Sequence, residues 1–458
     1  MRAFCIGFYA ASLLHWAEIK STFITMKTQN IAIIGAGTAG LAAAAMLAAQ
    51  GHQICLYEKV SQLEPVGAGL LLQPAGLAVF EHLGILEHAL SLGAVVTGLE
   101  GQLASGDLLI NSHYRQADER SYGLGIHRAT LCHVLASKVR EYPQHVEWCM
   151  AHEVHELQES SDGINVIGQS ADQSFQRQFD LVLIANGARS HLRPKAWEKL
   201  NQAYPWGAKW IIVPECEVLN PQILHQFYDR SNIMMGVMPT GAIPTLPEQR
   251  LSSIFWSLPT ADLEGFLKTK NAQQQWLLEV SKRWPSVAEW LAHVIPHPDD
   301  PQQWLSANYR DVVLSKLGEG RIGILGDAAH AMSPQLGQGA NMALLDAWAI
   351  SQALLQYQQD SSLQNLWQQY HQLRLSSVRF YQFFSRLLTP FYQSQHRWTA
   401  PLRDISFRAM YQLPFFRKEM AITISGLKTG AFGQMNYADI ARKPADDSAA
   451  ELRNLKFD

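Results

Sequence analysis

A glycine–aspartate pair followed by a glycine-rich loop is the clearest sign of chemistry in this 458-residue chain. An apolar, β-rich run stops at Gly326-Asp327. The loop that follows contains Pro334, Gly337 and Gly339, and we expect the next helix to begin near Asn341. A carboxylate accepts hydrogen bonds from hydroxyl groups, and the free N–H groups at a helix start stabilise negative charge. The stretch therefore suits a polyol that lies beside an anionic ring.

A second glycine motif lies near the start of the chain. An apolar strand, Ile31–Ile34, runs into an alanine-rich helix, which is followed by a second strand that ends in Glu58. Gly35 would make the tight turn, Gly37 would let a pyrophosphate approach the backbone, and Gly40 would let helix and strand pack closely. Glu58 stands where an acid can hold a ribose hydroxyl. This arrangement predicts a dinucleotide site, and a tight strand–helix–strand turn without a ligand is the simpler alternative.

Two further elements lie between these motifs in the sequence. Leu181–Ile184 is predicted to be a buried strand, and it is followed by Asn186-Gly187, Ser190 and Arg193. Arg128 is predicted to open an amphipathic helix, although a solvated arginine at a helix start is the alternative interpretation.

Together these elements make the chain, from about residue 27 to residue 398, resemble the single-component flavoprotein monooxygenases of the para-hydroxybenzoate hydroxylase fold. Within that group it resembles the salicylate hydroxylase-like enzymes. The two glycine motifs match the family's order and spacing. The middle element matches the family pattern Asp-Gly-x-x-Ser-x-x-Arg except that Asn186 replaces the first Asp. In the family this acid is associated with the flavin pyrophosphate and the nicotinamide donor, so we expect FAD binding with slow reduction by the donor in the absence of substrate.

The resemblance implies FAD as the tight cofactor, NADH or NADPH as co-substrate, and O₂ as the oxygen source. Oxygen would pass through a flavin C4a-hydroperoxide to hydroxylate or epoxidise a small aromatic or other electron-rich substrate. Residues 66–70 would lie near the moving isoalloxazine ring, and no metal is expected. The residues implied to bind the cofactor are Gly35, Gly37, Thr38, Ala39, Gly40, Glu58, Lys59, Gly69, Arg128, Asn186, Gly187, Asp327, Pro334, Gly337, Gly339, Ala340 and Asn341.

The expected fold class is α/β, with a Rossmann-like FAD-binding domain interleaved with an antiparallel-sheet substrate domain and followed by C-terminal helices. The FAD-binding domain is assigned to residues 27–95, 123–199 and 305–360, the substrate domain to 96–122 and 200–304, and the helical region to 361–458. Alternating apolar residues predict substrate-domain strands at Trp210–Val213, Ile233–Met238 and Ser252–Leu258. Helices from residue 361 onward are expected to pack across both domains.

The substrate site is less well defined by the sequence. Aromatic and methionine side chains of the predicted sheet could line a flat apolar pocket, although most of them are expected to be ordinary core: Trp210, Phe227, Tyr228, Met235, Met238, Phe255 and Trp256. Met238, Phe255 and Pro334 are the preferred pocket residues. The candidate catalytic residues are Pro334, Tyr228 and His225, with Arg230 as a further acid–base candidate. His330 is interpreted as a packed structural histidine.

Composition excludes several classes of function. A net charge of −3 gives no nucleic-acid or polybasic membrane footprint. The five cysteines are scattered without a CxxC pair, which predicts neither a disulfide framework nor a zinc site and fits the cytoplasm. Residues 1–26 are interpreted as an extension outside the fold, and a membrane-associating helix is the minority alternative; stable membrane insertion is not expected. The partners are expected to be small molecules, and the protein a monomer or homodimer.

Three other functions are considered. A flavin halogenase is disfavoured because the chain has no Trp-x-Trp-x-Ile-Pro segment. A flavin oxidoreductase without oxygenation, or a non-enzymatic flavin-binding redox sensor, would carry the same nucleotide motifs and stays open.

Overall fold

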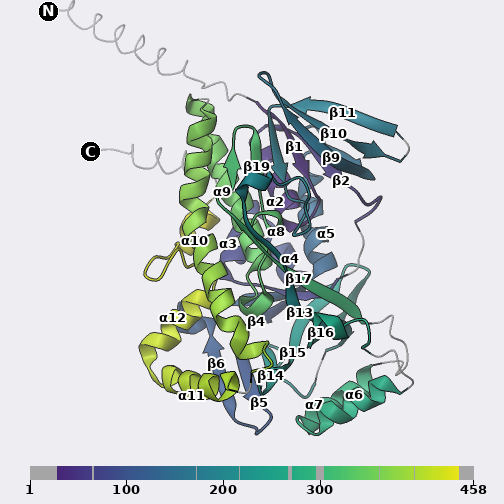
Figure 1. Cartoon of the computed structure of the whole chain (residues 1–458), viewed down its shortest axis with the longest axis vertical. Coiled ribbons are helices and arrows are strands. Elements are labelled where there is room, and N and C mark those ends of the chain that lie inside the picture. Colours follow the sequence, from purple (N-terminus) through teal and green to yellow (C-terminus); the bar gives the residue numbers. More distant parts are fainter. Residues whose placement is uncertain are drawn as a thin grey trace, which may run out of the picture.

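The structure is a computed structural model that describes residues 28–63, 67–171, 173–215, 217–266, 271–295, 304–360, 362–396 and 398–442 (Figure 1). The predicted extension at residues 1–26, Val66 of the predicted ring segment, and the tail from residue 443 lie outside this part of the chain. No helix within the described residues is long and apolar enough to cross a membrane.

A six-stranded sheet forms the centre of the region that is expected to bind FAD. Its spatial order is β18 (Gly318–Glu319), β19 (Ile322–Ile324), β12 (Leu181–Ile184), β1 (Asn30–Ile34), β2 (Gln53–Glu58) and β8 (Val146–Met150). The neighbours from β19 to β8 are parallel, and only β18 runs antiparallel. Nearly every residue of β1 and β12 is buried, which is the pattern of a parallel sheet covered on both faces. The strands predicted before Gly35, before Glu58, at Leu181–Ile184 and before Gly326 are confirmed.

Helices and a small sheet cover this central sheet. The helices that pack together beside it are α2 (Thr38–Ala49), α5 (Arg128–Val139) and α9 (Gly339–Asp360). A three-stranded antiparallel sheet, which the sequence did not predict, contains β9 (His152–Glu159), β10 (Ile164–Ser170) and β11 (Gln173–Phe179). The rings of Tyr57 on β2 and Phe175 on β11 stack at 5.3 Å, so this small sheet is packed onto β2.

A seven-stranded sheet forms the other large layer. Its order is β17 (Leu305–Leu314), β13 (Glu198–Pro214), β16 (Leu246–Pro259), β15 (Ile233–Ile243), β14 (Ile223–Asp229), β5 (Gly98–Leu103) and β6 (Leu108–His113). All neighbours are antiparallel except β14 and β5. The three predicted strands fall within β13, β15 and β16. Residues 305–314, which the predicted boundaries gave to the FAD-binding domain, instead pair with β13 in this sheet.

The remaining elements join the two layers. A short sheet contains β3 (Gly69–Leu72), β7 (Gly123–His127) and β4 (Ala94–Val96), and it is flanked by α3 (Pro74–Leu83) and α4 (Leu86–Leu92). Helices α6 (Ala272–Ser281) and α7 (Pro285–Val294) pack on the seven-stranded sheet and share an apolar core with it. The C-terminal helices are α10 (Leu363–Tyr392), α11 (Thr399–Gln412), α12 (Pro414–Ile424) and α13 (Tyr437–Ala441).

Helix α10 runs along both layers (Figure 1). It packs against α9, and its Gln382 Nε2 donates to the carbonyl of Val312 on β17 at 2.7 Å. Gln393, just after the helix, donates to Ser257 Oγ on β16 at 2.8 Å. The C-terminal region therefore holds the two sheets in a fixed relation, as the expected packing across both domains requires.

Candidate active site

The first glycine motif lies at the carboxyl edge of the parallel sheet, where β1 and β2 end. The carboxylate of Glu58 accepts hydrogen bonds from the N–H of Ala36 at 2.8 Å and from that of Val60 at 3.2 Å. Gly35 has a φ of +107°, and a Cβ there would lie 2.6 Å from the carbonyl oxygen of Ala185. A Cβ on Gly40 would lie 1.8 Å from the Gly35 oxygen, so the close contact between helix and strand needs glycine at this position.

Three observations at this edge fit a dinucleotide pyrophosphate. Helix α2 begins after Gly37 without a side-chain cap, which leaves the N–H groups of Thr38 and Ala39 in its first turn. A Cβ on Gly37 or on Gly187 would meet nothing within 4 Å, so the backbone there is open to approach. The Oδ1 atom of Asn186 is buried without a hydrogen-bond partner. The residues present therefore fit the cofactor that the resemblance implies.

Charged groups from three elements lie near this edge of the parallel sheet. The guanidinium of Arg128 and the carboxylate of Glu58 both act on the Cys132 thiol, whose pKa is raised chiefly by burial. Arg128 also acts on Asp327. Arg128 and Lys59 are exposed, so both are available to a ligand.

Asp327 opens the short helix α8 (Asp327–His330), directly after β19. Its side chain is open to solvent in a hollow that protein otherwise encloses. The resulting desolvation raises the pKa of its carboxyl; His330 and Arg128 oppose this shift, and Asp346 adds to it. An acid enclosed by protein in this way can be stabilised by a hydroxyl donor of a ligand that enters the hollow.

A buried carboxylate that the sequence analysis missed holds this loop. Asp346 Oδ2 accepts from the N–H of Gly326 at 2.7 Å and contacts His330 Nε2 at 2.6 Å, while Oδ1 accepts from Arg374 Nε at 2.6 Å. Burial by itself would raise the pKa of Asp346, but the charges of His330 and Arg374 outweigh it and hold the pKa below its usual value. His330 is thus packed and bonded, as expected. The sequence offered one signal for Asp346, because it is the single acid in the apolar helical stretch from Leu344 to Ala347.

The glycine-rich loop after Asp327 is tied to β3. Asn341 Oδ1 accepts from the N–H of Gln73 at 2.8 Å, and its Nδ2 donates to the carbonyls of Leu71 and Gly337. Helix α9 begins at Gly339, two residues before the predicted Asn341. The side chain of Asn341 therefore shapes the loop, and only its backbone is left for a ligand at the helix start.

A cavity of about 330 Å³ lies between this loop and the seven-stranded sheet. It is lined on the loop side by Asp327, Pro334, Gly337, Gly339 and Ala340, and on the other by Gly69 and the side chains of Trp210, Met238 and Phe255. The rings of Trp210 and Phe255 lie 5.1 Å apart. The preferred pocket residues Met238, Phe255 and Pro334 are all in the lining, whereas Phe227, Met235 and Trp256 lie in the core beneath α6 and α7. Alternation along each strand separates the two sets.

The three predicted acid–base candidates do not line this cavity. Tyr228 lies behind Gln226, to which its hydroxyl donates a hydrogen bond, and its ring packs against Tyr392. His225 lies on the opposite face of β14, with Nε2 at 3.3 Å from the carbonyl of Asn220. Arg230 lies in the turn after β14, at a φ of +56°.

Carboxamides, which the sequence analysis did not single out, are the most numerous polar side chains of the lining, beside hydroxyl groups, Asp327 and His330. They belong to Gln73, Gln226, Gln335, Gln338 and Gln393, here called the glutamine set. Gln335 donates to Gln393 at 2.7 Å, and Gln393 donates to Ser257, so part of the set is linked. Among the described residues that line the cavity there is no lysine or arginine.

Comparison with known proteins gives a consistent result. Residues 27–381 match the family model described as FAD binding domain. The chain is 26% identical over 324 residues to 3-amino-4-hydroxybenzoate 2-monooxygenase of Streptomyces cremeus, covering 69% of this chain and 76% of that protein. It is 26% identical over 391 residues to hispidin-3-hydroxylase of Neonothopanus nambi, covering 77% and 86%.

Solved structures share the fold. PqsL of Pseudomonas aeruginosa superposes with a TM-score of 0.70 at 19% identity, covering 82% of this chain and all of that one. The p-nitrophenol 4-monooxygenase of Pseudomonas putida also gives a TM-score of 0.70, at 17% identity and 88% and 99% coverage. With the nucleotide motifs in place and relatives named as monooxygenases and hydroxylases, the chain is an FAD-dependent monooxygenase. It belongs to the FAD binding domain family.

Proposed function

We propose that the protein uses NADH or NADPH and O₂ to hydroxylate an uncharged aromatic compound. The observation that carries this proposal is the cavity between the Asp327 loop and the seven-stranded sheet. Its walls are largely apolar and aromatic, its polar groups are carboxamides and hydroxyls together with Asp327 and His330, and no lysine or arginine lines it within the described residues.

The residues at the sheet edge would hold FAD by complementary polarity. Glu58 would accept a ribose hydroxyl, the start of α2 at Gly37 would face the pyrophosphate, and Asp327 would accept a ribitol hydroxyl. The N–H groups at the start of α9, near Gly339, would stabilise negative charge on the ring. When bound, FAD supplies the electron transfer and the oxygen activation. The chain's part is to orient the substrate and to exclude water from the cavity.

The side chains that line the cavity determine whether a charged or a neutral substrate binds. Relatives are named for benzoates, such as 3-hydroxybenzoate 6-hydroxylase of Klebsiella oxytoca, and also for a quinolone in 2-heptyl-3-hydroxy-4(1H)-quinolone synthase of Pseudomonas aeruginosa. A carboxylate in this cavity would lose its water without gaining a cationic partner, which costs several kcal/mol, on the order of 2–5. A carbonyl or hydroxyl group is instead well matched to the glutamine set, because a carboxamide both donates and accepts.

Matched pairs of compounds test this proposal. Purified protein with FAD is supplied with each donor and with aromatic acids alongside their amides or methyl esters, and donor consumption and added oxygen are measured. We expect the neutral member of a pair to be oxygenated and the acid to be a poor substrate. A preference for acids would refute the substrate class alone.

The same experiment distinguishes the two remaining candidate functions from oxygenation. Flavin reduction without an added oxygen in any product would indicate an oxidoreductase that does not oxygenate, and failure of both donors to reduce the flavin would indicate a redox sensor.

The proposal also includes a cytoplasmic location and a monomeric or homodimeric state. The free thiols at Cys55, Cys132 and Cys149 support the cytoplasmic location.

A further inference from the structure

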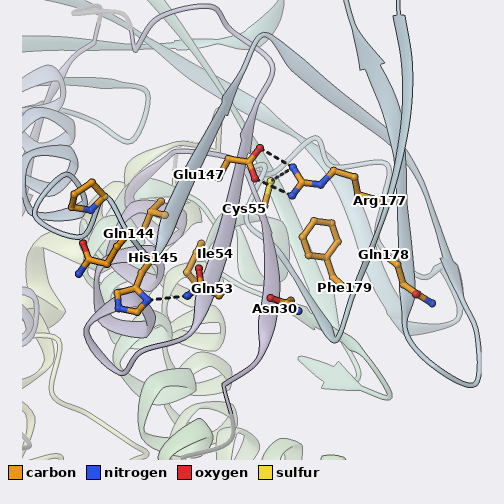
Figure 2. Close-up of a pocket in the computed structure, with 12 residues that line it drawn as sticks. Asn30, Gln53, Ile54, Cys55, Gln144, His145, Glu147, Arg177, Gln178 and Phe179 are labelled. Atoms are coloured by element: carbon orange, nitrogen blue, oxygen red, sulfur yellow. Dashed lines mark hydrogen bonds and ion pairs between the residues drawn. The ribbon is translucent and has the colours of Figure 1, made fainter.

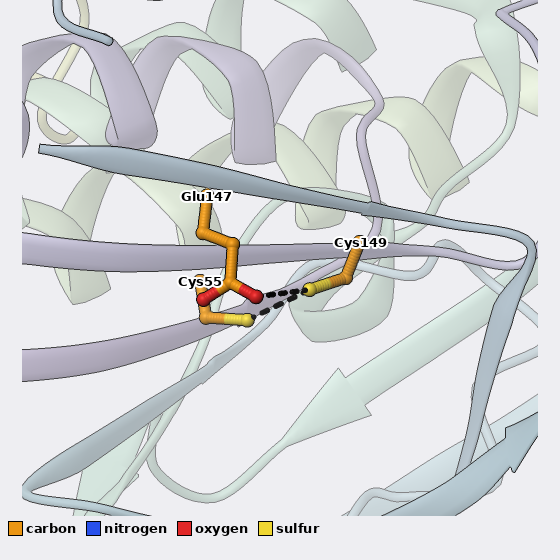
Figure 3. Close-up of side chains that lie close together, drawn as sticks. All are labelled: Cys55, Glu147 and Cys149. Atoms are coloured by element: carbon orange, nitrogen blue, oxygen red, sulfur yellow. Dashed lines mark hydrogen bonds between the residues drawn. The ribbon is translucent and has the colours of Figure 1, made fainter. Parts of the chain in front are cut away.

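Two cysteines that are far apart in the sequence meet on the parallel sheet. Cys55 lies on β2 and Cys149 on the neighbouring strand β8, and their Sγ atoms are 3.1 Å apart (Figure 3). They are 3% and 6% exposed. Neither belongs to the FAD motifs or to the substrate cavity.

A guanidinium stands beside this pair. Arg177 Nη1, from β11, donates to Cys55 Sγ at 3.5 Å, and the same guanidinium forms a two-point pair with the carboxylate of Glu147 at 2.8 and 2.9 Å (Figure 2). The hydrogen bond with Cys149 lowers the pKa of the Cys55 thiol, and Arg177 adds to this effect against the cost of burial. The pKa of Cys149 is raised by the same hydrogen bond and by burial. Arg177 contacts the Cys55 sulfur, whereas the Cys149 sulfur lies 3.7 Å from the Glu147 carboxylate, so this arrangement favours a thiolate at Cys55 and a thiol at Cys149.

The pair is next to an open pocket. A pocket of about 560 Å³ is lined by Cys55, Glu147 and Arg177, together with His145 and Phe179 (Figure 2). A small polar oxidant can approach Cys55 from this side.

Cys55, Cys149 and Glu147 also have the ligand types of a metal site, because their ligand atoms lie within 4.8 Å of one another. Two features speak against a cation. The Glu147 carboxylate is already paired with Arg177, whose positive charge lies beside the sulfurs. Two thiolates on zinc would lie about 3.8 Å apart, given bonds of about 2.3 Å in a tetrahedron, and the sulfurs here are closer. This distance and this charge suit sulfur–sulfur bond formation.

We propose that Cys55 and Cys149 form a dithiol that hydrogen peroxide converts to a disulfide. The Cys55 thiolate attacks one peroxide oxygen, the O–O bond breaks, and water leaves after protonation, which gives a sulfenic acid at Cys55. The Cys149 sulfur then attacks Cys55 and a second water leaves. Overall two thiols and one peroxide give one disulfide and two waters, so the sulfurs are oxidised and the peroxide is reduced.

The source of peroxide rests on the proposed function, and the dithiol chemistry does not. A flavin enzyme that reduces O₂ without oxygenating a substrate releases hydrogen peroxide close to this sheet. The disulfide would join β2 to β8, the edge strand, at a point three residues before Glu58.

The test uses full-length protein loaded with FAD and treated with hydrogen peroxide. We expect a loss of two thiols, a mass lower by two hydrogens, and a Cys55–Cys149 peptide in a non-reducing digest, all reversed by dithiothreitol. Cys149→Ser should stop at a sulfenic acid on Cys55 that dimedone traps, and Cys55→Ser should leave Cys149 reduced. Cys132→Ser, a change at another free cysteine, should behave as the wild type does.

A slower reaction in Arg177→Gln would support the role of the guanidinium. Persistence of both thiols while other cysteines oxidise would overturn the proposal, as would dimedone labelling confined to Cys149. A second arm supplies NADH or NADPH and air without substrate, with and without catalase. If added peroxide forms the disulfide and this arm does not, the dithiol stands and only the proposed enzymatic source fails.

Discussion

The six-stranded parallel sheet and the seven-stranded sheet place their functional groups in different ways. At the parallel sheet, the important groups are backbone N–H groups at strand ends and helix starts, with glycine where a ligand or another strand must come close. At the seven-stranded sheet, the important groups are side chains in mid-strand, such as Trp210 and Phe255, and the face on which they lie decides their role. Because backbone groups form the site at the parallel sheet, that site depends little on side-chain identity. The site at the seven-stranded sheet is formed by side chains, so single substitutions can change which ligand it binds.

The largest effect is expected where the cofactor loop is anchored. Asp346→Ala would leave Arg374 buried without its carboxylate, and the free energy of unfolding should fall by about 3–5 kcal/mol. Urea denaturation of the variant measures this loss. Glu279→Ala, which removes surface ion pairs with Lys282 and Arg283, is the control and should change the stability by no more than about 1 kcal/mol. The double variant Asp346→Ala/Arg374→Met should regain part of the loss; equal stability of wild type and Asp346→Ala would show that the buried pair is not an anchor.

The next largest effect is expected on FAD affinity, which should depend on the loop beside the parallel sheet and not on the seven-stranded sheet. Asp327→Ala should weaken FAD by roughly 1.5–3 kcal/mol, or about ten- to 150-fold, because a charged acceptor for a flavin hydroxyl is lost. Fluorescence titration of apo-protein with FAD measures the affinity. Asp162→Ala, in the exposed turn between β9 and β10, is the matched control. An unchanged FAD affinity would remove Asp327 from the cofactor site.

A change on the seven-stranded sheet should act on substrate alone. Gln226→Leu is expected to lower kcat/KM by about fivefold, or about 1 kcal/mol, with FAD affinity unchanged. Tyr228→Phe tests the hydrogen bond that orients this amide, and should have a smaller effect in the same direction. The comparison between the sheets would be broken if Gln226→Leu released FAD while leaving substrate kinetics intact.

The smallest effect concerns pH and the protein without FAD. The pKa of Asp327 is raised above its ordinary value of 3.8, so its charged form is less favourable in the folded than in the unfolded chain. This destabilisation is present above the raised pKa and disappears as pH falls through it and below 3.8. Asp327→Asn should therefore slightly raise the Tm of apo-protein at pH 7, and the difference should vanish near about pH 3. A lower Tm for the variant at pH 7 would contradict the assigned cost of burial.

Sequence reasoning succeeded where function depends on neighbours in the chain. Gly35, Gly40 and Glu58 lie within one strand–helix–strand unit, so their spacing alone predicted the turn, the close packing and the acid at the strand end. It failed where the side of a strand or the depth of a side chain had to be known: His225 lies on the opposite face of β14, and Tyr228 lies behind Gln226, which lines the cavity. Alternation predicts two faces but does not say which one meets the cofactor.

Long-range pairs were also beyond local patterns. Asp346 and Arg374 are 28 residues apart and on different helices, and Cys55 and Cys149 are 94 residues apart. Strand β17 leads into the elements that carry the cofactor loop, so its place in the sequence gave no sign that it pairs with β13. In each case the partner is set by how the layers pack.

The link between Asp346 and Arg374 also bears on the order of events during synthesis. The first glycine motif can form its turn once the early part of the chain has left the ribosome, because all its parts are local. The loop at Asp327 lacks part of its anchor until α10 has emerged and docked, since the Arg374 that pairs with Asp346 lies on that helix. A growing chain therefore passes through a stage in which the Asp346 carboxylate is without its arginine and the cofactor loop is loose. Flavin capture should be a late event, completed only after α10 has folded against α9.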